Sequence, residues 1–133
     1  AKKVTIPKTV TVDNVECQVT GIAAKAFKNS KKLQSIVIPD TITEIGAGSF
    51  EGCKNLKSVT IGKNVTSIGK NAFKNCKNLK KITVKSAKLA TVGKGAFTGI
   101  NRKCVIKVPK KQLKSYKSLL KGKGQKKSVK ITK

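Results

Sequence analysis

The chain has 133 residues, of which 31 are basic and five acidic, and its formal net charge is +26 at pH 7. It contains no histidine, so it lacks the commonest general acid–base residue, the base of most nucleophile pairs and the commonest metal ligand. This composition excludes most enzymes, and we expect a non-enzymatic protein without a cofactor. A core must be built mainly from valine, isoleucine and leucine, because there are four phenylalanines, one tyrosine and no tryptophan or methionine.

The positive charge is concentrated in the second part of the chain. Residues 1–51 hold all five acids and seven lysines, a net charge of +2, whereas residues 52–133 hold 24 basic residues and no acid. The two parts should therefore differ in the partners that they attract. No run of about 18 apolar residues is present, so we expect no segment that spans a membrane.

At the N-terminus, two short segments of alternating apolar residues, 10–12 and 15–19, flank the dipeptide Asp13-Asn14. Such a dipeptide between two alternating segments is typical of a β-hairpin turn. We expect a hairpin here, and we assign residues 1–18 to a cap that closes the N-terminal end of the fold.

The rest of the chain is dominated by an internal repeat of about 23 residues. Residues 33–55 and 56–78 are complete copies; a third begins at Leu79 with one residue inserted before Leu89, and an incomplete copy covers residues 19–32. A unit this short buries too little apolar surface alone, so the copies should stack and share one core. All phenylalanines occupy one repeat position: Phe27, Phe50, Phe73 and Phe97.

Each copy predicts a short strand, a bend and a second extended piece. Ile36 and Ile38 have the alternation of a strand, and Pro39 removes a ladder donor and turns the chain. The segment around Phe50 should close the coil with a helical or 3₁₀ turn. We therefore predict an α+β solenoid with a parallel sheet of one strand per repeat.

The C-terminal residues predict a second cap. A strand at residues 106–109 is followed by apolar residues at helical spacing over residues 113–120, and glycines at positions 122 and 124 should end the helix. Residues 128–131 predict a final edge strand, flanked by lysines that discourage pairing with another chain. We expect a single domain over residues 1–133, with a hairpin cap at 1–18, four repeats at 19–103, the first incomplete, and a helix–strand cap at 104–133.

The pattern I-P-x-x-[VI]-T-x-I-G-x-x-A-F-x-x-C-x-x-L-x-x-[VI], over roughly residues 19–108, resembles the BspA-like leucine-rich repeats of bacterial cell-surface proteins. Cys53 and Cys76 match its cysteine position, whereas Ser30 and Ile100 replace cysteine in the first and fourth copies. The resemblance implies a leucine-rich-repeat solenoid that is secreted or displayed on a bacterial cell surface. It also implies recognition or adhesion without catalysis, the partner being a protein or glycan of a host or neighbouring cell.

The four cysteines are expected to be structural. Cys53 and Cys76 lie one repeat apart, within the Cα separation of a disulfide, but stacked side chains point the same way and oppose the dihedral angle that a disulfide requires. We expect both to be buried free thiols. Cys17 and Cys104 belong to opposite caps, and because no C-x₂-C pair is present we expect no metal site.

Lysines at equivalent repeat positions should form columns on the surface. Two interpretations stay open: a solvated coat, for which the five acids are counter-charges, or a surface that binds an anionic polymer such as teichoic acid, a sulfated glycan or nucleic acid. Specific nucleic-acid readout is disfavoured, because Arg102 is the one arginine and Tyr116 the one aromatic residue available at the surface. The columns are Lys31 with Lys54 and Lys77, Lys57 with Lys80, and Lys70 with Lys94.

Outward positions of the predicted strands form the candidate partner-binding face. It should be flat, poor in aromatic residues and increasingly basic toward the C-terminus, so we expect modest affinity per module and avidity from many copies. We expect a monomer; a structural spacer between other domains is a third possible role. The candidate residues are Ser35, Val37, Lys57, Ser58, Thr60, Lys80, Lys81, Thr83 and Lys107.

Overall fold

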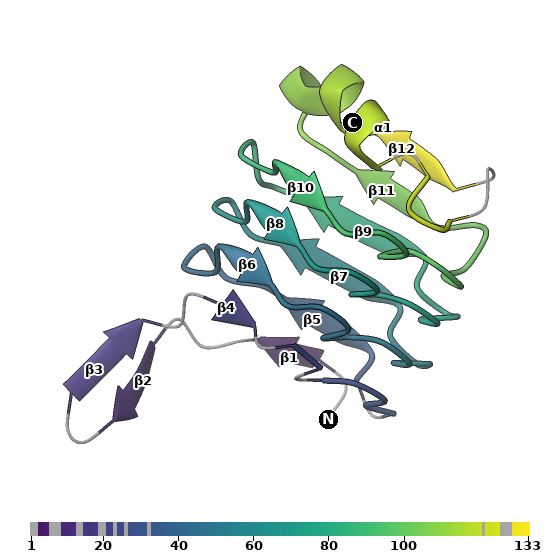
Figure 1. Ribbon diagram of the computed structural model, residues 1–133. Coiled ribbons are helices and arrows are strands. Elements are labelled where there is room, and N and C mark those ends of the chain that lie inside the picture. Colours follow the sequence, from purple (N-terminus) through teal and green to yellow (C-terminus); the bar gives the residue numbers. More distant parts are fainter. Residues whose placement is uncertain are drawn as a thin grey trace.

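The computed structural model describes residues 3–5, 9–12, 15–18, 21–22, 24–25, 27–31, 33–120, 122–125 and 129–133; for the first three of these ranges it describes the backbone alone. These residues form a β-solenoid of about five turns, each about 23 residues long (Figure 1). Two parallel sheets and a row of turns form the three sides of the coil.

The longer sheet takes one strand from each turn of the solenoid, as predicted. Its strands are all parallel and follow the order β1–β5–β7–β9–β11–β12. Equivalent repeat residues pair in register, so that Ile36 of β5 lies opposite Val59 of β7, which lies opposite Ile82 of β9. The strands are β1 (Lys3–Thr5), β5 (Ser35–Val37), β7 (Ser58–Ile61), β9 (Lys81–Val84), β11 (Val105–Lys107) and β12 (Lys130–Thr132).

The second extended piece of each repeat forms a shorter parallel sheet. Each strand contributes two residues, and the second residue is buried in every case. This burial agrees with the inward position predicted for the apolar residue there. The strands are β4 (Gly21–Ile22), β6 (Glu44–Ile45), β8 (Ser67–Ile68) and β10 (Thr91–Val92), in the order β10–β8–β6–β4.

Turns, and not helices, form the third side of each coil. The Phe50 N–H donates to the Ala72 C=O of the next coil at 2.8 Å, and the Phe73 N–H donates to the Ala96 C=O at 2.8 Å. Because these backbone groups bond between coils, they are not free for the bonds of a helix within one coil. The α+β assignment of the repeats is therefore wrong, and the helices that the structure describes lie in the C-terminal cap.

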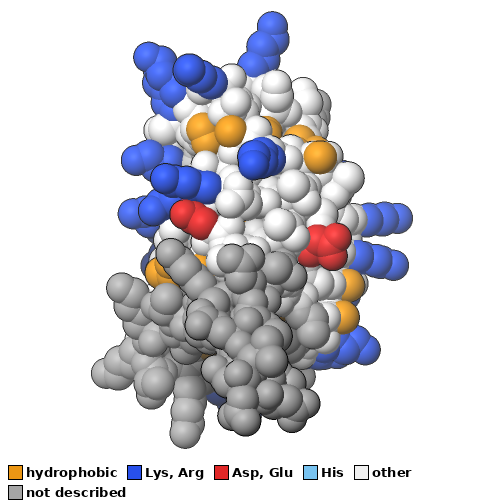
Figure 2. All heavy atoms as spheres, turned by 90° about the vertical axis from the view of Figure 1, so that its left-hand side faces the viewer, with side chains coloured by type: hydrophobic (Ala, Val, Ile, Leu, Met, Phe, Trp, Pro, Cys, Tyr) orange, Lys and Arg blue, Asp and Glu red, His pale blue; other side chains and the backbone are white. Residues whose placement is uncertain are grey.

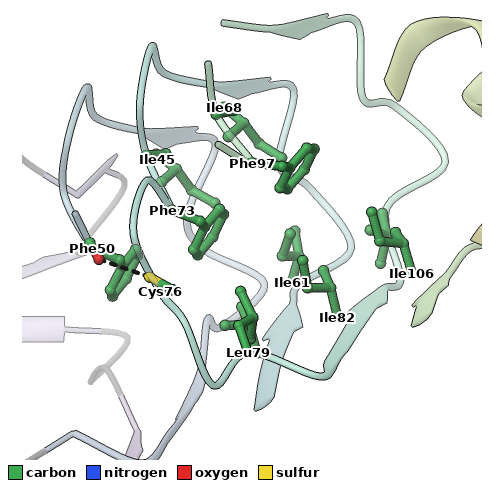
Figure 3. Packing of buried hydrophobic residues seen from close by; sticks show 14 of the residues in the cluster. Ile45, Phe50, Ile61, Ile68, Phe73, Cys76, Leu79, Ile82, Phe97 and Ile106 are labelled. Atoms are coloured by element: carbon green, nitrogen blue, oxygen red, sulfur yellow. Dashed lines mark hydrogen bonds between the residues drawn. The ribbon is translucent and has the colours of Figure 1, made fainter. Parts of the chain in front are cut away.

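Apolar side chains from all three sides meet in one core (Figure 3). The rings of Phe27, Phe50, Phe73 and Phe97 stack with centroid separations of 5.3, 5.3 and 6.0 Å and interplanar angles of 1°, 3° and 4°. The last three rings are at most 1% exposed. The predicted phenylalanine column is confirmed, and it runs parallel to the inward residues of both sheets.

The C-terminal cap is one further coil in which a helix takes the place of the short strand. The 3₁₀ helix η1 (Lys110–Gln112) and helix α1 (Leu113–Leu120) follow β11, and α1 packs against β10 and β12. Beyond the helix, the Lys123 C=O accepts the Phe97 N–H at 2.9 Å, and β12 pairs with β11. The predicted helix and strand therefore both form. No helix in the described part of the chain is long and apolar enough to cross a membrane.

The predicted N-terminal hairpin forms, but its role as a cap is not confirmed. β2 (Thr9–Val12) and β3 (Val15–Gln18) pair antiparallel with each other, and with no other strand that the structure describes. The first strand of the longer sheet is instead β1, which pairs with β5 and was not predicted because three residues carry too short a pattern. The Asp13-Asn14 turn lies outside the described residues.

Candidate functional site

The outward face of the longer sheet is an array of side chains in two columns. In β7, for example, Val59 and Ile61 are buried, whereas Ser58 and Thr60 point outward and are half-buried. Because the strands pair in register, outward residues align from strand to strand. One column is Ser35, Ser58, Lys81, Val105 and Lys130, and the other is Val37, Thr60, Thr83, Lys107 and Thr132.

The structure brings the nine predicted face residues together. Seven of them belong to the two columns, and the other two, Lys57 and Lys80, lie at the rim, where the Lys80 N–H donates to the Lys57 C=O at 3.0 Å. The face is uncharged across β5 and β7 and gains lysines across β9, β11 and β12. Sequence reasoning missed the contribution of β12, including Lys130, because the pairing partner of an edge strand cannot be read from its own residues.

Beside this face, near the ends of β5 and β7, lies a hollow of about 230 Å³. Its lining joins Val37 and Thr60 of the outward face to Asp40 and Lys85, which have opposite charges. The Asp40 Oδ1 also accepts a hydrogen bond from the Lys63 N–H at 2.9 Å, which holds the carboxylate in place. Asp40 and Lys85 were not predicted as site residues, because they become neighbours only when successive coils stack.

The shorter sheet presents a different outward face. Glu44, Ser67 and Thr91 align across β6, β8 and β10. The aligned column of the shorter sheet carries an acid and lacks the lysines of the longer sheet, so this face provides a matched reference surface. Figure 2 shows the left-hand side of Figure 1, where uncharged groups fill much of the described middle and most lysines project from the two margins.

The predicted lysine columns lie on the surface. The Asn55 Nδ2 donates to the Lys31 C=O at 2.7 Å, and the Asn78 Nδ2 donates to the Lys54 C=O at 2.8 Å, which places these lysines on successive coils. Both lysines are exposed. An ion pair of 3.6 Å joins Lys28 to Glu51 near the N-terminal end, and Glu51 is the last acid in the sequence, so residues 52–133 contain none.

The described carboxylates do not converge on a cleft. Asp40 follows the longer sheet, Glu44 lies in β6, and Glu51 lies on the turn side of the coil. In the part of the chain that the structure describes, no three cysteine, aspartate or glutamate residues are grouped so that they could hold a metal ion. The described carboxylates therefore form neither a paired-acid site nor a metal site.

Three cysteines are buried free thiols, as expected for Cys53 and Cys76. The Cys53 Sγ donates to the Phe27 C=O and the Cys76 Sγ donates to the Phe50 C=O, both at 3.0 Å. The neighbouring Cys53 and burial raise the pKa of the Cys76 thiol, and burial raises the pKa of Cys104 to about 12. Buried thiols whose pKa is raised, as at Cys76 and Cys104, are inert. The side chain of Cys17 lies outside the described residues.

Tyr116 is not available at the surface, and that expectation is wrong. Its side chain is 3% exposed, its hydroxyl donates to the Ser86 C=O at 2.8 Å and accepts from the Leu89 N–H at 3.0 Å. Burial raises the pKa of this hydroxyl. Tyr116 thus fixes α1 to the loop that holds the inserted residue of the third repeat, and it cannot serve as a platform for stacking.

Known proteins share this repeat. A family model for the BspA type leucine-rich repeat region, in six copies, matches residues 20–133. A leucine-rich repeat protein from Bacteroides capillosus is 29% identical, with a TM-score of 0.72, and the match covers 80% of this chain and 76% of that chain. A second, from Bacteroides ovatus, is 30% identical with a TM-score of 0.69 and coverage of 82% and 30%. A leucine-rich cell surface protein from Faecalibacterium prausnitzii is 28% identical with a TM-score of 0.55 and coverage of 80% and 38%.

No curated protein matches the chain. The chain spans most of the first relative but only 30% and 38% of the other two. The family model nevertheless covers nearly all of the repeats and the C-terminal cap, and this type of repeat is typically non-catalytic. The register of the strands and the phenylalanine stack are what such repeats require. The chain therefore belongs to the BspA-type leucine-rich repeat family.

Proposed function

We propose that this chain is a non-enzymatic recognition module that is secreted or displayed on a bacterial cell surface and binds a protein or glycan. The contact surface is the outward face of the longer sheet. The observation that carries the proposal is the alignment of its half-buried and exposed side chains in two columns across successive strands. The relative from Faecalibacterium prausnitzii, which is named as a cell surface protein, supports the location.

The chemistry of the face suits weak, repeated contacts. Ser35, Ser58 and Thr60 offer hydroxyl groups that donate and accept hydrogen bonds, and the adjoining hollow adds a carboxylate and an ammonium group. The face has none of the tryptophan, tyrosine and arginine residues that dominate tight interfaces. Binding should therefore depend on many copies acting together on one surface.

A display experiment tests this role. The chain is coupled at high density to beads and presented with an array of matrix proteins and glycans. The double variant Ser58→Glu/Thr60→Glu places two bulky charges on the proposed face and should lower bead binding by about tenfold, equal to about 1.4 kcal/mol. The control Ser67→Glu/Thr91→Glu makes the same change on the shorter sheet and should leave binding within about twofold.

Two results would contradict the proposal. An equal loss of binding in both double variants would show that added negative charge, and not the longer sheet, decides the interaction. An array without any partner at micromolar bead-bound protein would favour a structural spacer. Circular dichroism of each variant verifies that the solenoid is intact before binding is compared.

A further inference from the structure

The C-terminal cap gathers basic side chains around two hollows. One, of about 430 Å³, is lined by Arg102, Lys103, Val105 and Lys130. The other has a volume of about 390 Å³ and lies beside α1. All charged side chains in both linings are positive. The lining of the second hollow is Lys110, Lys111, Leu113, Lys114, Lys117 and Lys133.

Strand β12 connects the two hollows. Lys130 is its first residue and lines one hollow, and Lys133 directly follows its last residue and lines the other. A strand advances by about 3.3 Å per residue, so these two lysines lie about 10 Å apart along the chain direction. A small anion can occupy one hollow, but only an extended ligand can reach both.

The lysines beside α1 are held together against their mutual repulsion. Lys110, Lys114 and Lys117 recur at helical spacing, and like charges three or four residues apart destabilise a helix by about 0.2–0.5 kcal/mol per pair. No acid occurs in residues 52–133 to offset this cost. The buried hydroxyl bonds of Tyr116 nevertheless fix the helix on the solenoid. The backbone positions that carry these exposed lysines are therefore fixed before any ligand arrives.

The lining favours anionic groups and offers little to other groups. The described side chains that line the hollow beside α1 are lysines and the aliphatic side chain of Leu113, with no aromatic ring among them. Bases of single-stranded nucleic acids bind mainly by stacking on aromatic rings, and Tyr116 is buried. Lysine ammonium groups bind phosphate as compact point charges.

We propose that the C-terminal cap binds a linear phosphodiester polymer without bases, a polyol phosphate, which lies along β12 and places phosphates in both hollows. The cap binds this ligand through charge alone, so the affinity depends on the number of phosphates that contact basic side chains. The site goes beyond the recognition role of the longer sheet, because its main determinants are the helix lysines and not the two columns of the sheet.

Titration of the full chain with poly(glycerol phosphate), followed by calorimetry at several salt concentrations, tests the proposal. The variant Lys110→Gln/Lys114→Gln/Lys117→Gln removes three contacts. The control Lys63→Gln/Lys70→Gln/Lys94→Gln removes the same charge from exposed lysines of the repeats. At 0.1 M salt each contact contributes roughly a factor of five, so the cap variant should lose about a hundredfold in affinity and the control much less. The slope of log affinity against log salt should fall by about 2 in the cap variant.

Three outcomes would overturn the proposal. Equal losses in the two triple variants would show attraction to overall charge without a site. Tighter binding of heparin or of duplex DNA than of poly(glycerol phosphate), compared at equal charge, would assign the cap to a different class of polymer. Glycerol phosphate monomer that binds as tightly as the polymer would exclude an extended ligand. Neither triple variant should unfold, because removal of like charges relieves repulsion, and thermal melting verifies this.

Discussion

Replacing Phe73 by alanine tests whether the stacked coils share one core. The Phe73 ring is fully buried between those of Phe50 and Phe97, at centroid separations of 5.3 and 6.0 Å. The substitution removes both ring contacts and leaves a cavity between the two remaining rings. Since the backbone of this coil is hydrogen-bonded to both neighbouring coils, it cannot move inward to fill the cavity.

The size of the effect follows from this rigidity. Truncation of a core phenylalanine to alanine costs about 3–5 kcal/mol, and the cost is highest where the site cannot collapse. We therefore expect the free energy of unfolding to fall by about 4–5 kcal/mol, a large part of the roughly 5–15 kcal/mol that stabilises a typical domain. Phe27 is half-buried at the end of the stack with one ring neighbour, so Phe27→Ala should cost about half as much.

Urea unfolding followed by circular dichroism measures both variants. The Phe73 variant should show a lower midpoint at an unchanged slope. A loss below about 1.5 kcal/mol, the range of well-tolerated core changes, would refute the shared core. Equal losses for the two variants would refute the argument that the number of ring neighbours decides the cost.

Three further predictions concern the cap and the turns. Tyr116→Phe leaves the buried Leu89 N–H without its partner and should cost about 1–3 kcal/mol in urea unfolding; an unchanged midpoint would show that the hydroxyl does not fix α1. Gly95 has a φ of 75°, and a Cβ there would meet Asn71 Oδ1, so Gly95→Ala should cost more than the roughly 1–2 kcal/mol of a left-handed residue, and adding Asn71→Gly should recover part of the loss. The raised pKa of Cys104 stabilises the fold while its thiol is protonated, so the free energy of unfolding should fall as the pH rises from about 9.0 toward about 12; an identical pH dependence in Cys104→Ala would contradict this.

Much of the fold could be predicted because the same pattern of apolar residues occurs in several copies of the repeat. The alternation of Ile36 and Ile38 reappears as Val59 and Ile61, so the strand signal of one copy is confirmed by the next. The turn side could not be predicted in this way. Around Phe50, local residues permit a helical turn, and only the backbone bonds to neighbouring coils show that the chain forms separate turns there instead of a helix.

The candidate site was predictable in part. Outward residues such as Ser58 and Thr60 follow from strand alternation once the inward residues are known. The basic hollows of the cap could not be predicted, because Lys133 meets Lys114 only when β12 joins the sheet next to β11. Tyr116 was misplaced for a similar reason: the groups that it bonds belong to the inserted loop, 27 and 30 residues away along the chain.

By itself, the sequence determined the repeat length, the phenylalanine column, the strand of each copy and the imbalance of charge, because periodicity and composition are properties of the chain alone. The tertiary structure decided that turns, and not helices, form the third side of each coil. It also decided the burial of Tyr116 and the convergence of lysines on the C-terminal cap. These features depend on bonds and contacts between coils, and each is formed by residues that lie about one repeat or more apart, so no local pattern contains them.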